Sequence, residues 1–195
     1  NLMNKELLKT QSGQSIEGPI VIKTNIFEDQ RGFFYESWNS KIFNELILDK
    51  VKFVQDNISF SKKGVLRGLH FQREPYAQGK LVKCASGLIF DVVLDLRQDS
   101  KTFSKWAGIF LSSDNLNQLW IPKGFAHGFL TLSSKAEVSY KTTDYWNKEH
   151  EMSIFWDDKN INIQWPLEKI SSKVITNQKD KYAKNLFKIK KEFLF

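Results

Sequence analysis

Two side chains in the stretch RGLHFQ have the chemistry of a site. His70 is one of only three histidines in the chain, and Arg67 lies three residues before it. An imidazole titrates near neutral pH and can accept or release a proton, and a guanidinium suits paired hydrogen bonds to phosphate. The alternative is that His70 is a core histidine whose hydrogen bonds the fold satisfies. This stretch alone leaves both interpretations open.

The spacing of this pair conflicts with a regular strand. Side chains three residues apart point to opposite faces of a strand, so Arg67 and His70 would not share one cavity. Gly68 lies between them. A glycine inside a strand often marks a bulge, which changes the direction of nearby side chains. We therefore predict an irregularity at Gly68 that lets Arg67 and His70 face the same interior.

Two further strands place chemically active side chains by alternation. In GKLVKCA, Lys80 shares a face with Val82 and Cys84, and in AEVSYKT, Tyr140 shares the less charged face with Val138. Tyr140 is expected to point inward, where its hydroxyl needs a partner. Lys80 either points inward too, which is costly without a partner, or lies at a strand end and reaches water along its stem.

The elements that carry these residues are mostly strands. From about residue 51 to 165, short apolar or alternating runs follow one another between clusters of Gly, Ser, Asn, Asp and Pro, with no helix between them. This pattern favours an antiparallel sandwich or barrel. Asn39 or Ser40 can cap a short helix in SKIFNELILDK, and KDKYAKNLFKIKKEF has the pattern of one or two amphipathic helices.

Composition and charge exclude several classes of protein. The chain of 195 residues is 41% hydrophobic and 26% charged, which is typical of one globular domain. Residues 167–195 hold eight lysines and three acidic residues, hence five of the seven net positive charges, and the nearly neutral remainder argues against a nucleic-acid partner. A single cysteine, Cys84, and no long apolar run predict a cytoplasmic protein without a membrane span or a signal peptide.

A resemblance to the cupin superfamily begins at IPKGFAHGF. Pro122, Gly124 and His127 match its Pro-x-Gly-x-x-His signature. The first cupin signature would bring a His-x-His pair and a glutamate for a metal, but here that place reads His70-Phe71-Gln72. With one histidine there, the usual metal set cannot form, so we expect a cupin without metal.

The chain more specifically resembles the dTDP-4-dehydrorhamnose 3,5-epimerase family over about residues 17–185. The matching blocks, in order, are IFEDQRGFFYESW, FVQDNISFSKKGVLRGLHFQ, AQGKLVK, IFDVVLDLRQDSKTF, QLWIPKGFAHGFLTLS, YKTTDYW and IFWDDKNINIQWP. The resemblance implies an all-β cupin-type double-stranded β-helix, or jelly-roll, with short N-terminal and C-terminal helices. We expect a single domain over residues 1–195, with a β core of about 17–166 and a helical segment of about 167–195.

The resemblance also implies the reaction. The family's substrate is a nucleotide-linked 4-keto-6-deoxyhexose, whose C3 and C5 protons are α to the C4 ketone, so each can leave to form an enolate. Inversion needs a base on one face, an acid on the other and a cation near the oxygen, with no cofactor. By similarity His70 is the base, Tyr140 the opposite-face acid and Lys80 the cation. Asp180 is the closest match to the carboxylate that supports the base.

The remaining matches are to substrate-binding residues and imply a homodimer. Arg67 matches a diphosphate contact, and Arg31 matches one that reaches the neighbouring subunit's site from the N-terminal strands. His127 matches a second inward histidine that binds the sugar or diphosphate, and Asp91 could pair with it or with Lys80. The resemblance gives contacts to the base, ribose or phosphate at Glu36, Gln55 and Asn57, and rings that flank the base at Phe27 and Trp146.

Three alternatives remain open from the sequence. The family commonly has tyrosine at position 146, so Trp146 could mark a different nucleotide such as GDP, for example on a 4-keto-deoxyheptose. The enzyme could also invert only C3 or only C5. A cupin that binds a sugar nucleotide without catalysis is a further alternative, which the retention of His70, Lys80 and Tyr140 opposes.

Overall fold

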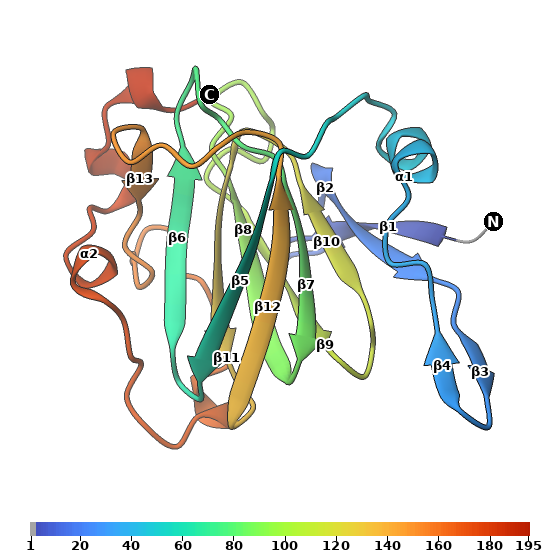
Figure 1. Ribbon diagram of the computed structural model, residues 1–195. Helices are drawn as coiled ribbons and strands as arrows, with labels where there is room; N and C mark the ends of the chain where they lie inside the picture. The colour runs from blue at the N-terminus through green and yellow to red at the C-terminus, as the bar shows by residue number, and fades with distance from the viewer. Residues whose placement is uncertain (1–2) are drawn as a thin grey trace.

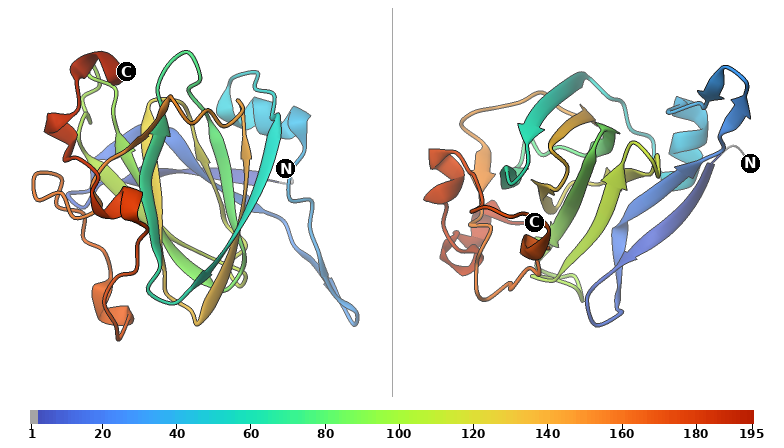
Figure 2. Two further views of the ribbon diagram at one scale, coloured as in Figure 1. Left: turned by 60° about the vertical axis from the view of Figure 1, so that its left-hand side comes forward. Right: turned by 90° about the horizontal axis from the view of Figure 1, so that it is seen from below.

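Two antiparallel sheets face one another in the computed structural model, which describes residues 3–195 (Figures 1 and 2). The six-stranded sheet has the order β1 (Met3–Lys9), β2 (Ser15–Thr24), β10 (Gln118–Ile121), β7 (Lys80–Ser86), β12 (Lys135–Thr142) and β5 (Gln55–Lys62). The five-stranded sheet has the order β13 (Glu151–Ser153), β6 (Leu66–Gln72), β11 (Phe125–Thr131), β8 (Leu88–Asp95) and β9 (Trp106–Ser112). The predicted antiparallel all-β architecture is confirmed; β1 and the start of β2 precede the core expected from residue 17.

Strand alternation divides the apolar side chains between the interior and the outer face of the five-stranded sheet. On β8, Ile89 and Val93 join the cluster between the sheets, whereas Val92 and Leu94 join the cluster outside. Period-two alternation produces this division, and it places Asp91 on the inner face beside Ile89 and Val93. The interior between the sheets therefore holds charged groups within an apolar lining.

The predicted short helix near residue 40 is confirmed. Helix α1 (Ser40–Ile47) begins at Asn39, whose side chain accepts hydrogen bonds from the backbone N–H groups of Lys41 and Ile42, and it buries Phe43. An asparagine at this position satisfies amide groups that lack partners within the helix. Before it, the hairpin of β3 (Phe27–Asp29) and β4 (Gly32–Phe34) projects away from the two sheets (Figure 1).

The predicted short C-terminal helices are present, but the one or two amphipathic helices expected over KDKYAKNLFKIKKEF are divided into shorter pieces. The segment contains η1 (Leu167–Lys169), α2 (Gln178–Lys181), η2 (Leu186–Lys188) and η3 (Lys191–Phe193), each only three or four residues long. Its backbone bonds to the body instead: the N–H of Phe155 donates to the Lys184 carbonyl, and the N–H of Leu186 donates to the Asp158 carboxylate. Leu186 and Ile189 join the outer apolar cluster. These tertiary contacts outweigh the helical pattern of the sequence.

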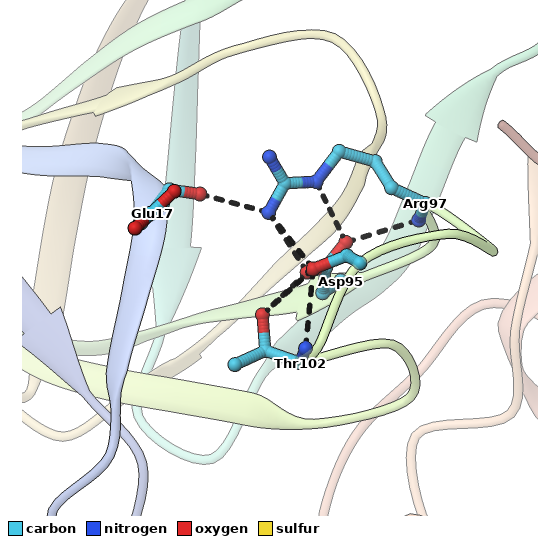
Figure 3. Close-up of polar contacts among 5 residues, drawn as sticks. Glu17, Asp95, Arg97 and Thr102 are labelled. Atoms are coloured by element: carbon cyan, nitrogen blue, oxygen red, sulfur yellow. Dashed lines mark hydrogen bonds and ion pairs between the residues drawn. The ribbon is translucent and has the colours of Figure 1, made fainter.

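A polar network closes the loop that follows β8 (Figure 3). The buried carboxylate of Asp95 accepts hydrogen bonds from the Arg97 guanidinium, from Ser100 Oγ and from Thr102 Oγ1, at 2.7 to 3.0 Å. Arg97 also donates to the carbonyl of Glu17 on β2. The network thereby ties one sheet to the other.

No helix within residues 3–195 has the length and apolar character needed to span a membrane.

Candidate active site

The predicted irregularity at Gly68 is confirmed, and it puts Arg67 and His70 on the same side of β6. The Cα partner of His70 on β11 is His127, whereas that of Arg67 is Phe129. The step from Arg67 to His70 is three positions along β6, but the matching step on β11 is only two positions, so β6 holds one extra residue. Leu66 and Leu69, also three apart, both join the outer cluster. The extra residue therefore shifts the alternation, as a bulge does.

Glycine is required at the bulge for two reasons. Gly68 has a φ of +123°, a backbone conformation that side chains with a Cβ rarely adopt. A Cβ there would also lie 2.6 Å from Gly128 Cα on β11. The close approach of these two strands thus depends on Gly68.

His70 forms a hydrogen bond with the carboxylate predicted to support it. His70 Nε2 lies 2.6 Å from Asp180 Oδ1, and Asp180 Oδ2 accepts the backbone N–H of Gly68 at 3.0 Å. Asp180 is held at the start of α2, where Asn177 caps its N–H. A carboxylate on Nε2 fixes the proton there and leaves Nδ1 as the basic nitrogen.

Burial sets the charge of this pair. Loss of water around the imidazole lowers the pKa of His70 below its ordinary value, despite the attraction of Asp180. Burial alone would raise the pKa of Asp180, but the hydrogen bonds from His70 and Gly68 bring it below its ordinary value. The pair at neutral pH is therefore a neutral imidazole beside a carboxylate, which is the state of a general base.

A second histidine–carboxylate pair lies beside the first. His127 Nε2 is 2.9 Å from Asp91 Oδ2, and this pairing decides between the two partners considered for Asp91. The same Nε2 lies 2.9 Å from Asp91 Oδ1, and among the described residues no second group hydrogen-bonds to this oxygen. Burial raises the pKa of Asp91 in spite of the nearby charges of His127 and Lys80. This carboxylate has unused capacity to accept a hydrogen bond.

Lys80 and Tyr140 enter the interior from the opposite sheet. They lie on the adjacent strands β7 and β12, where Lys80 pairs with Thr142 and Tyr140 with Val82. Tyr140 packs against the inner apolar cluster, as alternation predicts. Within residues 3–195, no hydrogen bond reaches Lys80 Nζ or Tyr140 Oη.

Lys80 is the first residue of β7 and is half-buried, and it shares the inner face of the strand with Val82 and Cys84, so it lies at a strand end and also faces inward. Burial lowers the pKa of Lys80 to about 8, against the attraction of the Glu151 and Asp91 carboxylates. Burial, with the Glu151 charge, raises the pKa of Tyr140. Lys80 is thus a cation without a direct partner, and Tyr140 is a phenol that stays protonated.

Glu151 and Lys179 complete the charge around the interior, and sequence reasoning missed both. Glu151 begins β13 and forms an ion pair with Lys179, with Nζ 2.8 Å from Oε2. Burial would raise the pKa of Glu151, but Lys179 lowers it below the ordinary value. Lys179 directly precedes Asp180, so the prediction for Asp180 could have pointed to it. Glu151 lies in a charged loop sequence that contains no pattern typical of a site residue.

Several residues predicted to bind the nucleotide lie along the rim of the interior. Gln55 Nε2 donates to Asn57 Oδ1 at 2.9 Å, and Gln55 Oε1 accepts the backbone N–H of Trp146 at 3.1 Å. Asn57 is the Cα partner of Tyr140. Arg67 donates to Ser61 Oγ on β5. The structure thus brings Arg67, Gln55, Asn57 and Trp146 to the strands that carry the catalytic candidates.

The N-terminal candidates do not join them. Phe27 and Arg31 lie on the projecting hairpin, and the Arg31 guanidinium, 85% exposed, forms an ion pair with Asp29. Glu36 follows this hairpin and lies 3.5 Å from the Asn39 amide. Phe27, Arg31 and Glu36 are therefore not assembled with the interior of their own chain.

Neither cysteine nor metal chemistry is indicated by the side-chain arrangement. Burial raises the pKa of Cys84 to about 11, so its thiol stays protonated. Across residues 3–195, no three His, Cys, Asp or Glu side chains gather closely enough to hold a metal ion.

The sequence pattern of the dTDP-4-dehydrorhamnose 3,5-epimerase family matches residues 13–188. The chain belongs to this family. It is 55% identical to the dTDP-4-dehydrorhamnose 3,5-epimerase of Shigella flexneri over 162 residues, which cover 82% of this chain and 90% of that one. The family resemblance proposed from the sequence is confirmed.

Solved structures of epimerases share the fold. The dTDP-6-deoxy-D-glucose-3,5-epimerase of Legionella pneumophila, crystallised with dTDP-4-keto-L-rhamnose, has a TM-score of 0.90 and 46% identity, covering 98% of this chain and 97% of that one. A 3'-monoepimerase of Streptomyces bikiniensis, crystallised with dTDP-quinovose, has a TM-score of 0.83 and 27% identity, covering 88% and 85%. The epimerase family shares the cupin-type jelly-roll, so the predicted fold class is confirmed.

Proposed function

We propose that this protein is an isomerase that inverts C3 and C5 of dTDP-4-dehydro-6-deoxy-D-glucose to give dTDP-4-dehydro-L-rhamnose. The observation that carries the proposal is the His70–Asp180 pair, which faces Lys80 and Tyr140 across the space between the two sheets. Family membership and the nucleotide sugar bound by the Legionella relative support the substrate class.

His70 acts as the base. Its neutral imidazole removes the proton from C3 or C5 through Nδ1, and Asp180 stabilises the imidazolium that forms. The electrons of the broken C–H bond pass to the C4 oxygen, giving an enolate. Lys80 stabilises this oxygen, because a cation without a direct partner in a buried site interacts strongly with a developing negative charge.

Tyr140 completes the inversion. It lies on β12 of the sheet opposite β6, so its hydroxyl approaches the other side of a sugar that sits between the sheets. Since burial keeps the phenol protonated, it donates the proton that restores the carbon with the opposite configuration. The proton removed by His70 and the one supplied by Tyr140 balance, so no oxidant is needed.

The substrate's nucleotide lies along the rim. Arg67 binds the diphosphate, Gln55 and Asn57 bind the ribose or base, and Trp146 stacks on the base. His127, held by Asp91, binds the sugar or diphosphate. Trp146 is 55% exposed, and a ring that stacks on a flat ligand must be accessible.

A homodimer completes the site. Phe27, Arg31 and Glu36 lie on or after a hairpin that stands apart from its own interior, and Phe27, Phe33 and Phe34 on it are exposed. A second copy that receives this hairpin would bury these rings, and Arg31 of the first copy would then reach the diphosphate site of the second.

The cytoplasmic location stays a prediction from the sequence.

Solvent exchange tests the reaction. The protein is incubated in D₂O with dTDP-4-dehydro-6-deoxy-D-glucose, and deuterium at C3 and C5 is followed by NMR. Exchange at both carbons is expected; exchange at one carbon identifies a mono-epimerase, like the Streptomyces relative. Nucleotide binding without exchange identifies a binding protein. The same assay with the GDP-linked sugar in place of the dTDP-linked one tests which nucleobase the site accepts.

A chelator is expected to leave the exchange rate unchanged, and strong inhibition by the chelator would contradict metal independence.

Tyr140→Phe tests the division of roles. We expect the variant to retain proton exchange, since His70 can still remove and return a proton on one face, while net inversion falls about 10²-fold or more. Exchange and inversion are measured in the same NMR sample. Equal loss of both would contradict the role of Tyr140 as the opposite-face acid.

A further inference from the structure

The loop that carries Trp146 is held by three glutamines. Residues 144–147 lie in the connection between β12 and β13. Gln78 Nε2 donates to the Asp144 carbonyl at 2.8 Å, Gln72 Nε2 donates to the Tyr145 carbonyl at 3.1 Å, and Gln55 Oε1 accepts the N–H of Trp146 at 3.1 Å. Consecutive backbone units of a surface loop are thus bound by side chains from elsewhere in the chain. We call Gln55, Gln72 and Gln78 the glutamine clamp.

Gln72 is the most completely used member of the clamp. Its side chain is buried, with 3% of the residue exposed. Its Oε1 accepts the N–H of Asn147 at 2.8 Å, and its Nε2 donates to Tyr76 as well as Tyr145. A buried amide is unfavourable unless its hydrogen bonds are made, and here all of them go to loop backbone. Gln72, at the end of β6, therefore holds the backbone of the loop on both sides of Trp146.

The exposure of Trp146 makes the position of its backbone important. More than half of the residue is exposed. Its backbone N–H is bound by Gln55, and the carbonyl of the preceding Tyr145 is bound by Gln72. An exposed aromatic residue whose backbone is already held in place loses less conformational entropy when a ligand stacks on its ring.

We propose that Gln72 and Gln78 are positioning residues that hold Trp146 for stacking on the nucleobase. This inference rests on the proposed function, because the ligand of the ring is the base of a nucleotide sugar. The clamp contributes to substrate affinity and not to proton transfer. Its effect therefore belongs to KM and to nucleotide binding, with kcat set by His70, Lys80 and Tyr140.

Methionine variants test the clamp, since methionine keeps the length of glutamine without its hydrogen bonds. We expect Gln72→Met to weaken the binding of dTDP, measured by calorimetry, about tenfold, and Gln78→Met, which loses one bond, about threefold. KM rises in parallel, and kcat from the exchange assay stays within about twofold. Gln98→Met is the matched control, because Gln98 donates to the Lys191 carbonyl in the C-terminal segment.

A double-mutant cycle shows whether Gln72 acts through Trp146. If it does, adding Gln72→Met to Trp146→Ala weakens dTDP binding no further. Fully additive effects, unchanged binding in Gln72→Met, or a kcat loss as large as the KM change would each overturn the inference. If Gln72→Met does not fold, as judged by circular dichroism, Gln78→Met decides by the same criteria.

The two proposals fail differently. If the unmodified protein binds no dTDP and exchanges no C3 or C5 proton, the proposed function is wrong. If it does both, and the clamp variants behave as the unmodified protein does, only the positioning role is wrong.

Discussion

Two aspartates on one strand differ in how their charge is used. Asp91 and Asp95 both lie on β8, four residues apart, and both are completely buried. Asp95 accepts hydrogen bonds from Arg97, Ser100 and Thr102 (Figure 3). Asp91 has a single donor among the described residues, His127, whose Nε2 lies 2.9 Å from each of the two carboxylate oxygens. Equal burial therefore does not mean equal satisfaction.

The pKa values of the two carboxyls follow from this difference. Burial would raise the pKa of Asp95, but its many hydrogen bonds lower it below the ordinary value. With one histidine as partner, burial raises the pKa of Asp91. A satisfied charge stabilises the fold, whereas an unsatisfied one is available to a ligand or a proton. We use this contrast to separate structural from functional polar groups.

Replacement of His70 gives the largest expected effect on activity. His70→Asn removes the base, so exchange at both C3 and C5 is expected to fall at least about 10³-fold. The unfolding free energy, from denaturant titration, is expected to change by about 1–2 kcal/mol, because Asn can still donate one hydrogen bond to Asp180. Retention of more than a tenth of the exchange rate at either carbon would contradict the role of His70 as the catalytic base.

Lys80 sharpens the contrast, because it is half-buried without a direct partner. Lys80→Met is expected to reduce exchange about 10²- to 10³-fold, through loss of the charge beside the enolate oxygen. Since burial disfavours the Lys80 cation in spite of Glu151 and Asp91, the unfolding free energy is expected to stay unchanged or to rise by about 1 kcal/mol. A large loss of stability with retained exchange would make Lys80 a structural residue.

Much of the site was predictable because its residues lie in local patterns. Gly68 predicted the bulge between Arg67 and His70, and strand alternation predicted the inward face of Tyr140. The partner of His70 came from similarity alone, since Asp180 is distant in sequence. These predictions succeeded where a strand's alternation or a motif fixes the direction of the side chain.

The sequence failed where contacts join distant segments without a pattern. Glu151 and Lys179 are 28 residues apart, and neither lies in a regular element of more than four residues. The C-terminal segment has the periodicity of a helix, but its backbone bonds to the loop after β13. In both cases tertiary contacts decide the structure, and local propensity does not report them.

Asp95 provides the opposite test, in which stability falls and catalysis does not. Asp95→Asn places an amide among the donors of Arg97, Ser100 and Thr102, and we expect a loss of about 3 kcal/mol, or about 10²-fold in the unfolding equilibrium. Melting temperature should fall by roughly 5–10 °C. The exchange rate of the folded variant is expected to stay within about twofold.

Asp91→Asn is the matched partner of that variant on the same strand. It should lower exchange about tenfold or more, because His127 loses its carboxylate, with a smaller loss of stability than Asp95→Asn. The contrast between the two aspartates would be wrong if Asp91→Asn were the more destabilising, or if Asp95→Asn lost the activity.

The pH profile gives the smallest effect, about tenfold per pH unit. Lys80 must be charged to stabilise the enolate, and its pKa of about 8 predicts that kcat/KM falls as the pH rises through 8. His70 must be neutral, and burial lowers its pKa below the ordinary 6.5, so activity should decline only below pH 6.5. Exchange at subsaturating substrate from pH 5 to 10 measures both limbs. Lys80→Met should lose the alkaline limb alone, because the group that titrates there is gone; an unchanged alkaline limb would assign it to another residue.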